Sequence, residues 1–135
     1  MFGNTQKVAE VVAKTLGGPA VRVSDFKPDM LKKIDLLVVG SPIQGWRPTQ
    51  ATIDFLNRLP ENCLNKINIA AFDTRIKIFF SGSASDKISD QLENLGGNVI
   101  IAPTNFIVKS KEGPLLDGEL NKASDWATQI LTKLK

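Results

Sequence analysis

The sequence predicts an α/β domain whose parallel sheet is doubly wound, with helices on both faces. Two continuous apolar runs, residues 35–40 and 67–72, have the composition of strands buried on both faces. Amphipathic segments with helical spacing alternate with these runs, and this alternation is typical of parallel βαβ units. A length of 135 residues suits one domain spanning 1–135.

Four helices are expected, each from an apolar stripe with helical spacing. In the first, residues 4–16, Val8, Val11, Val12 and Leu16 form the stripe. Asn4 is a favourable N-cap, and Gly17-Gly18-Pro19 ends the helix. The other helices are expected at 49–59, 84–95 and 119–133.

Four strands are expected between these helices, at 20–23, 35–40, 67–72 and 98–102. A turn of helix at 30–33 and a short extended piece at 106–108 complete the pattern. Pro and Gly mark residues 41–49 as a loop, and residues 73–83 are expected to form another. Because ligands of such sheets bind at the carboxyl ends of the strands, these loops and the chain start are the candidate site.

Composition narrows the chemistry that the chain can perform. There is no His, which removes the commonest general base, and Cys63 is alone, without a base to activate it. Any redox chemistry is therefore expected to belong to a bound cofactor. The single Cys fits a reducing cytoplasm. No apolar run is long enough to span a membrane, and the basic residues are too scattered to favour nucleic-acid binding.

The start, "FGNT", is the first candidate binding element. Gly3 permits close backbone approach, while Asn4 and Thr5 lie at a helix N-terminus, where free N–H groups and the helix dipole favour an anion. A plain N-cap explains these four residues equally well.

The second candidate element is the loop "SPIQGWRPT". Trp46 lies in it between Gly45 and Arg47, where a flat ring can stack on a ligand ring. The alternative is that Trp46 folds back over the core. The candidate ligand-binding residues of this loop are Ser41, Pro42, Ile43, Gln44, Gly45 and Trp46.

The third candidate element is Asp73-Thr74-Arg75, whose backbone could reach the polar edge of a flat ligand. A local ion pair between Asp73 and Arg75 is the competing interpretation. Phe79 and Phe80 either close the pocket or belong to the core, whereas Trp126 lies on an apolar helix face and is expected in the core.

Taken together and in order, these stretches resemble the flavodoxin family over nearly the whole chain: "FGNT", "VVGSPIQGWRPT", "AAFDTR", "SGSASDKISDQLENLGG" and "NFIVKSKEGPLLDGEL". The resemblance implies strand order 2-1-3-4-5, with FMN at the switch point between strands 1 and 3. Flavodoxins are a standard example of ligand binding at the point where the strand order reverses. It implies electron transfer with redox partner proteins. A flavin-dependent reductase is a close variant, which the absence of His and Tyr disfavours. It places the phosphate on Gly3, Asn4 and Thr5 and the isoalloxazine between the other two elements, with Trp46 as the stacking ring.

The chain departs from the family pattern in its phosphate turn, where Phe2 replaces a hydroxyl residue, and in having no Tyr. By the same resemblance, the family's first strand would precede Met1, so an N-terminally truncated domain is expected. A gap, or a strand from a neighbouring chain, should then lie between the 20–23 and 35–40 strands, and a homodimer could form through these unpaired edges. The alternative function is a flavodoxin-like module that has lost FMN and acts as an interaction partner or not at all.

Overall fold

The computed structural model describes residues 3–44, 47–76, 84–110 and 113–134. Its helices are α1 (Asn4–Leu16), the 3-10 helix η1 (Pro28–Lys33), α2 (Gln50–Arg58), α3 (Ala84–Asn94) and α4 (Glu119–Leu134). Its strands are β1 (Leu36–Gln44), β2 (Arg47–Pro48), β3 (Asn68–Ile76), β4 (Asn98–Val99) and β5 (Thr104–Val108).

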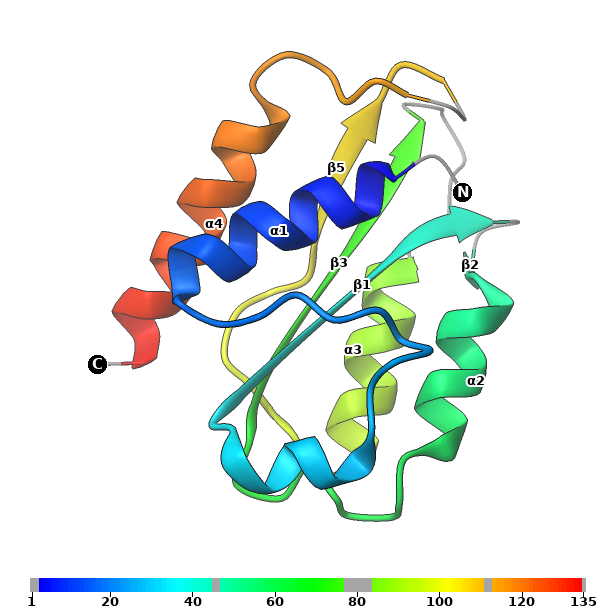
Figure 1. The fold of residues 1–135 in the computed structure, drawn as a ribbon, viewed down its shortest axis with the longest axis vertical. Coiled ribbons are helices and arrows are strands. Elements are labelled where there is room, and N and C mark those ends of the chain that lie inside the picture. The colour runs from blue at the N-terminus through cyan, green and yellow to red at the C-terminus, as the bar shows by residue number, and fades with distance from the viewer. Residues whose placement is uncertain (1–2, 45–46, 77–83, 111–112, 135) are drawn as a thin grey trace.

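The sheet is built around β3, which pairs in parallel with β1 on one side and with β4 and β5 on the other (Figure 1). The β1–β3 register runs from Leu36 opposite Asn68 to Pro42 opposite Thr74. Both β4 and β5 pair with β3, β4 at its beginning and β5 at its end, so together they act as one interrupted strand. The expected order of the last three strands is confirmed.

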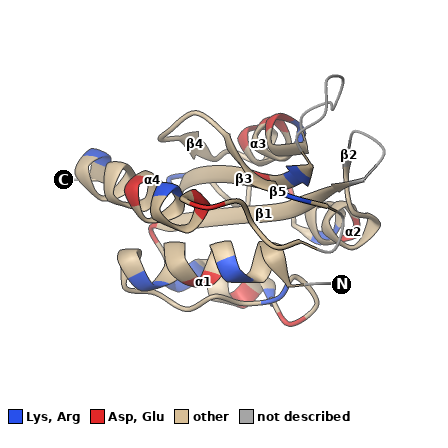
Figure 2. Ribbon diagram, turned by 90° about the horizontal axis from the view of Figure 1, so that it is seen from above, with Lys and Arg blue, Asp and Glu red and all other residues tan. Residues whose placement is uncertain are grey.

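Helices cover both faces of the sheet: α1 and α4 pack on one face and α2 and α3 on the other. Figure 2 shows α1 and α3 on opposite sides of the strands. Successive residues of a strand point to opposite faces, so β3 contributes to two separate cores. Ala70 and Phe72 pack with α1 and α4, whereas Ile69 and Ala71 pack with α2 and α3. This three-layer arrangement confirms the doubly wound α/β class.

The helices follow the sequence prediction, but the strand expected at 20–23 is wrong. These residues lie in an irregular connection between α1 and η1. Val23 packs against the α2-side core, Arg58 Nη2 donates to Val23 O at 3.1 Å, and Phe26 meets Phe55 edge-on. A β-strand is defined by pairing with a neighbouring strand, and no described strand lies beside residues 20–23.

The expected ends of the other three strands are also wrong. β1 continues past Gly40 to Gln44. β3 continues to Ile76, into the segment expected to be a loop, because Phe72–Ile76 pairs with the whole of β5. The 98–102 strand shortens to Asn98–Val99, and the extended piece expected at 106–108 is β5, which begins at Thr104. Pro103, which has no N–H to donate, separates the two pieces.

The two long edges of the sheet differ in how their backbone groups are satisfied. Along β5, Ile107 N donates to Glu119 Oε1 at 2.6 Å, Lys122 Nζ donates to Asn105 O at 2.6 Å, and Leu116 N donates to Ile107 O at 2.9 Å. Along β1, no described strand pairs with Leu36–Pro42 on the side away from β3. Among the described residues no strand lies between residues 20–23 and β1, and the expected truncation stays a prediction.

Gly40 provides a test of the β1–β3 packing. A Cβ at this position would lie 2.0 Å from Phe72 Cζ, and the Phe72 ring is itself buried between helices and sheet. We expect Gly40→Ala to lower the free energy of unfolding by about 1–3 kcal/mol, measured by urea denaturation. Gly18→Ala is the matched control because a Cβ there meets nothing within 4 Å. Equal stability of the two variants would contradict this packing.

Candidate functional site

The three elements singled out in the sequence meet at the carboxyl edge of the sheet. There the beginning of α1 lies near the ends of β1 and β3 (Figure 1). A hydrogen bond of 2.7 Å between Thr5 Oγ1 and Thr74 Oγ1 joins the first turn of α1 to the end of β3. The first and third predicted elements are therefore in direct contact, although 69 residues separate them in the sequence.

The N-terminus of α1 has no side-chain cap. Its N-cap is Gly3, with φ of 78°, rather than the Asn4 expected from the sequence, and the first turn contains no acidic residue. Lys7 N donates to Gly3 O, which closes the first helical turn and leaves the amides of Asn4, Thr5 and Gln6 without intrahelical acceptors. An uncapped helix start with open space beside Gly3 is suited to an anion.

Asn4 is buried against the segment that follows β5. Only 8% of it is exposed, and a Cβ on Gly113 would approach its side-chain oxygen to 2.7 Å. Gly113 therefore allows the later segment to pack on the first turn of α1, and its φ of 97° also favours glycine. This contact leaves Thr5 and the backbone amides as the more available donors.

The second element is a β-hairpin rather than a loop. Ile43 pairs with Pro48 and Gln44 with Arg47 in antiparallel register. The tip, Gly45 and Trp46, lies outside the described residues, so the stacking role of Trp46 stays a prediction.

The base of this hairpin is held by buried hydroxyl groups. Ser41 is fully buried; its Oγ donates to Pro42 O at 2.8 Å and accepts from Thr49 N at 3.1 Å. Thr49 in turn caps α2 by accepting from Thr52 N. Through these hydrogen bonds Ser41 connects the two ends of the hairpin. Pro42 and Ile43, which follow it in β1, are half-buried.

The third element contains the ion pair between Asp73 and Arg75, which was one of its two interpretations from the sequence. Asp73 is fully buried, and Arg75 binds it through both Nε at 2.8 Å and Nη2 at 2.5 Å. Ser85 N, in the first turn of α3, donates to the same carboxylate at 2.9 Å. Asp73 and Arg75 therefore satisfy each other, and Thr74 provides the hydroxyl that faces α1.

Sequence reasoning missed Ser85 and Gly113. No local pattern links Asp73 to an amide 12 residues later, and only the sheet packing brings them together. The expectation for Trp126 is confirmed, since its ring is 5% exposed and lies 6.0 Å from Phe72. Phe79 and Phe80 lie outside the described residues.

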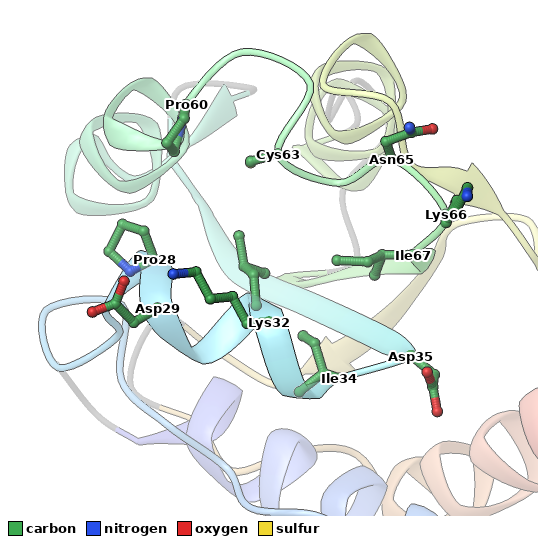
Figure 3. Close-up of a pocket in the computed structure, with 11 residues that line it drawn as sticks. Pro28, Asp29, Lys32, Ile34, Asp35, Pro60, Cys63, Asn65, Lys66 and Ile67 are labelled. Atoms are coloured by element: carbon green, nitrogen blue, oxygen red, sulfur yellow. The ribbon is translucent and has the colours of Figure 1, made fainter.

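A cleft of about 560 Å³ opens near the amino ends of β1 and β3, far from these elements (Figure 3). Its walls come from η1 and from the segment before β3, with Leu31, Cys63 and Ile67 beside both lysine and aspartate side chains. Burial raises the pKa of the Cys63 thiol, which keeps it protonated and unreactive at neutral pH. The cleft's position and mixed charge do not match the predicted ligand site.

Among the residues that the structure describes, no cluster of His, Cys, Asp or Glu could hold a metal ion. Within the same residues, every helix is too short or too polar to traverse a bilayer.

Comparison with solved structures shows that the fold is flavodoxin-like. Oxidised flavodoxin 1 from Bacillus cereus is 17% identical with a TM-score of 0.83, and the match covers 100% of this chain and 94% of that one. The flavodoxin of Streptococcus pneumoniae TIGR4 is 16% identical with a TM-score of 0.82, covering 98% and 93%. Rubredoxin oxygen:oxidoreductase from Desulfovibrio gigas is 16% identical with a TM-score of 0.77, and the match spans 99% of this chain but 35% of that one. No family model and no curated protein matches the sequence.

The Thr5–Thr74 hydrogen bond can be measured by a double-mutant cycle. We expect Thr5→Val and Thr74→Val each to destabilise the fold, because each leaves one hydroxyl without its partner. The double variant should lose less than the sum, with a coupling energy of about 0.5–1.5 kcal/mol from chemical denaturation. Additive losses would mean that the two hydroxyls do not interact.

Proposed function

We propose that the chain is an FMN-binding electron-transfer domain that works with redox partner proteins. The observation that carries the proposal is the uncapped N-terminus of α1, which lies beside the ends of β1 and β3. The flavodoxin-like fold supports it, because open α/β sheets bind ligands at this edge. FMN, when bound, supplies the redox chemistry, and the protein contributes binding, orientation and electrostatics.

The first turn of α1 fits a phosphate group. Free amides at the start of a helix, no acidic side chain in its first turn and the Thr5 hydroxyl together favour a dianion there. Gly3, Asn4 and Thr5 would hold the phosphate, with the amides and Thr5 as donors. The Thr74 hydroxyl lies 2.7 Å from that of Thr5 and would donate to it, so that the Thr5 proton is available to the phosphate.

The isoalloxazine would lie between the β1–β2 hairpin and the end of β3. Ser41 orients the hairpin from its base, Pro42, Ile43 and Gln44 lead to Gly45, and Trp46 would stack on the ring. On the other side, Asp73 and Arg75 form a neutral pair, so this wall adds little net charge. A ring site with little positive charge disfavours the anionic reduced flavin and lowers its potential.

A second candidate function is a flavodoxin-like module without flavin. The open edge of β1 favours it, because an unpaired edge weakens the support for the carboxyl end of that strand. The same edge could pair with that of a second copy and form a homodimer. The cytoplasm remains the expected compartment because the single cysteine needs no oxidising environment.

Flavin binding and the role of Trp46 can be tested together by titrating FMN and following its visible spectrum and fluorescence. We expect a bound, quenched flavin, and about 1–3 kcal/mol weaker binding for Trp46→Ala, the size of one lost aromatic contact. Trp126→Phe is the control: its ring lies in the α4 core, so affinity should hold while stability falls. Equal affinity of Trp46→Ala and the parent chain would remove Trp46 from the site. A parent chain that stays colourless with excess FMN would favour the module without flavin.

The homodimer can be tested by sedimentation equilibrium combined with amide hydrogen exchange. If two copies pair through β1, dimerisation should rise with protein concentration, and the amides of β1 that face away from β3 should exchange more slowly in parallel. A mass that remains monomeric at high concentration would rule out this assembly.

A further inference from the structure

A side-chain hydroxyl takes the place of a backbone contact at the base of the β1–β2 hairpin. The antiparallel register that pairs Ile43 with Pro48 sets Pro42 opposite Thr49 one step further on. Opposed pairs alternate between hydrogen-bonded and non-hydrogen-bonded, and Pro48, which has no N–H, fits the second kind. A backbone bond from Thr49 N to Pro42 O is therefore expected. Thr49 N instead donates to Ser41 Oγ at 3.1 Å, and Ser41 Oγ donates to Pro42 O at 2.8 Å.

The Ser41 hydroxyl thus replaces one rung of the ladder with a two-step bridge. Pro42 has no N–H of its own, which leaves its pair with Thr49 a single backbone bond to make, and Ser41 mediates that bond. β2 contains two residues, so little other pairing holds it against β1. The separation of the two segments at the hairpin base is therefore set by Ser41.

Ser41 has no remaining capacity to contact a ligand. It is fully buried, its single proton goes to Pro42 O, and its oxygen accepts from Thr49 N. The next hydroxyl oxygen, Thr49 Oγ1, lies 3.4 Å away and accepts from Thr52 N as the cap of α2. One buried group therefore links the carboxyl end of β1 to the start of α2.

We propose that Ser41 is a positioning residue, which fixes the hairpin on one side of the ring site by holding Pro42 O and Thr49 N one hydroxyl bridge apart. Without this hydroxyl both backbone groups lose their partner, and the hairpin populates orientations that do not fit the ring. The effect on flavin rests on the proposed function. The bridge itself exists without a ligand and can be measured separately.

The test combines amide hydrogen exchange of the flavin-free chain with a titration of FMN. In Ser41→Ala the Thr49 amide should exchange about tenfold faster and FMN should bind about tenfold more weakly, because one buried hydrogen-bond partner is lost. Ser41→Thr keeps the hydroxyl in a residue that suits a strand, and both values should return to within about threefold of the parent. Ile88→Val is the matched control, since it lowers stability through the α2-side core without touching the bridge, and both values should hold.

The two readouts separate the role of Ser41 from flavin binding. Unchanged exchange of the Thr49 amide in Ser41→Ala would overturn the inference, as would a loss of protection equal to that in Ile88→Val. In a parent chain that binds FMN, equal affinity of Ser41→Ala would also overturn it. If Ser41→Ala does not fold, Ser41→Cys replaces the hydroxyl with a weaker donor and should shift both values in the same direction. A parent chain that binds no FMN would count against the proposed function alone, because the exchange data still decide the role of Ser41.

Discussion

The parallel pairing of β1 with β3 brings the carboxyl ends of both strands to the same edge, and the candidate site depends on that alignment. The register sets Ser41 opposite Asp73 and Pro42 opposite Thr74. Ser41 then organises the hairpin, Asp73 organises the start of α3, and Thr74 reaches α1. A slip of one residue would turn each of these side chains to the other face of the sheet and separate them from their partners.

Hydroxyl groups perform much of the alignment at this edge. Ser41, Thr49 and Thr52 bond to one another beneath the hairpin, and Thr5 bonds to Thr74 across the top of the α1 layer. Because a hydroxyl both donates and accepts, these short side chains connect backbone segments without introducing charge. The ion pair of Asp73 with Arg75 is buried at the same edge.

Local pattern was sufficient for the helices and for the cores of the strands, because apolar spacing is decided within each segment. It was insufficient where pairing between strands decides the outcome. β3 extends to Ile76 because β5 lies beside it, whereas residues 20–23 form no strand because no described strand lies beside them. At the site, the positions of Gly3, Thr5 and Thr74 could be anticipated from strand ends and helix starts. The bond from Ser85 to Asp73 could not, since it depends on how α3 returns over the sheet.

The closed edge along β5 limits how molecules of this kind can join. Glu119 and Lys122 from α4 and the backbone of Leu116 already occupy hydrogen-bonding groups there, and β4 is only two residues long. Fibre growth by strand addition requires two adhesive edges on every molecule, so that each new member presents another. A sheet with one unpaired edge can add one further molecule and no more. By covering the β5 edge, α4 therefore prevents polymerisation through strand addition.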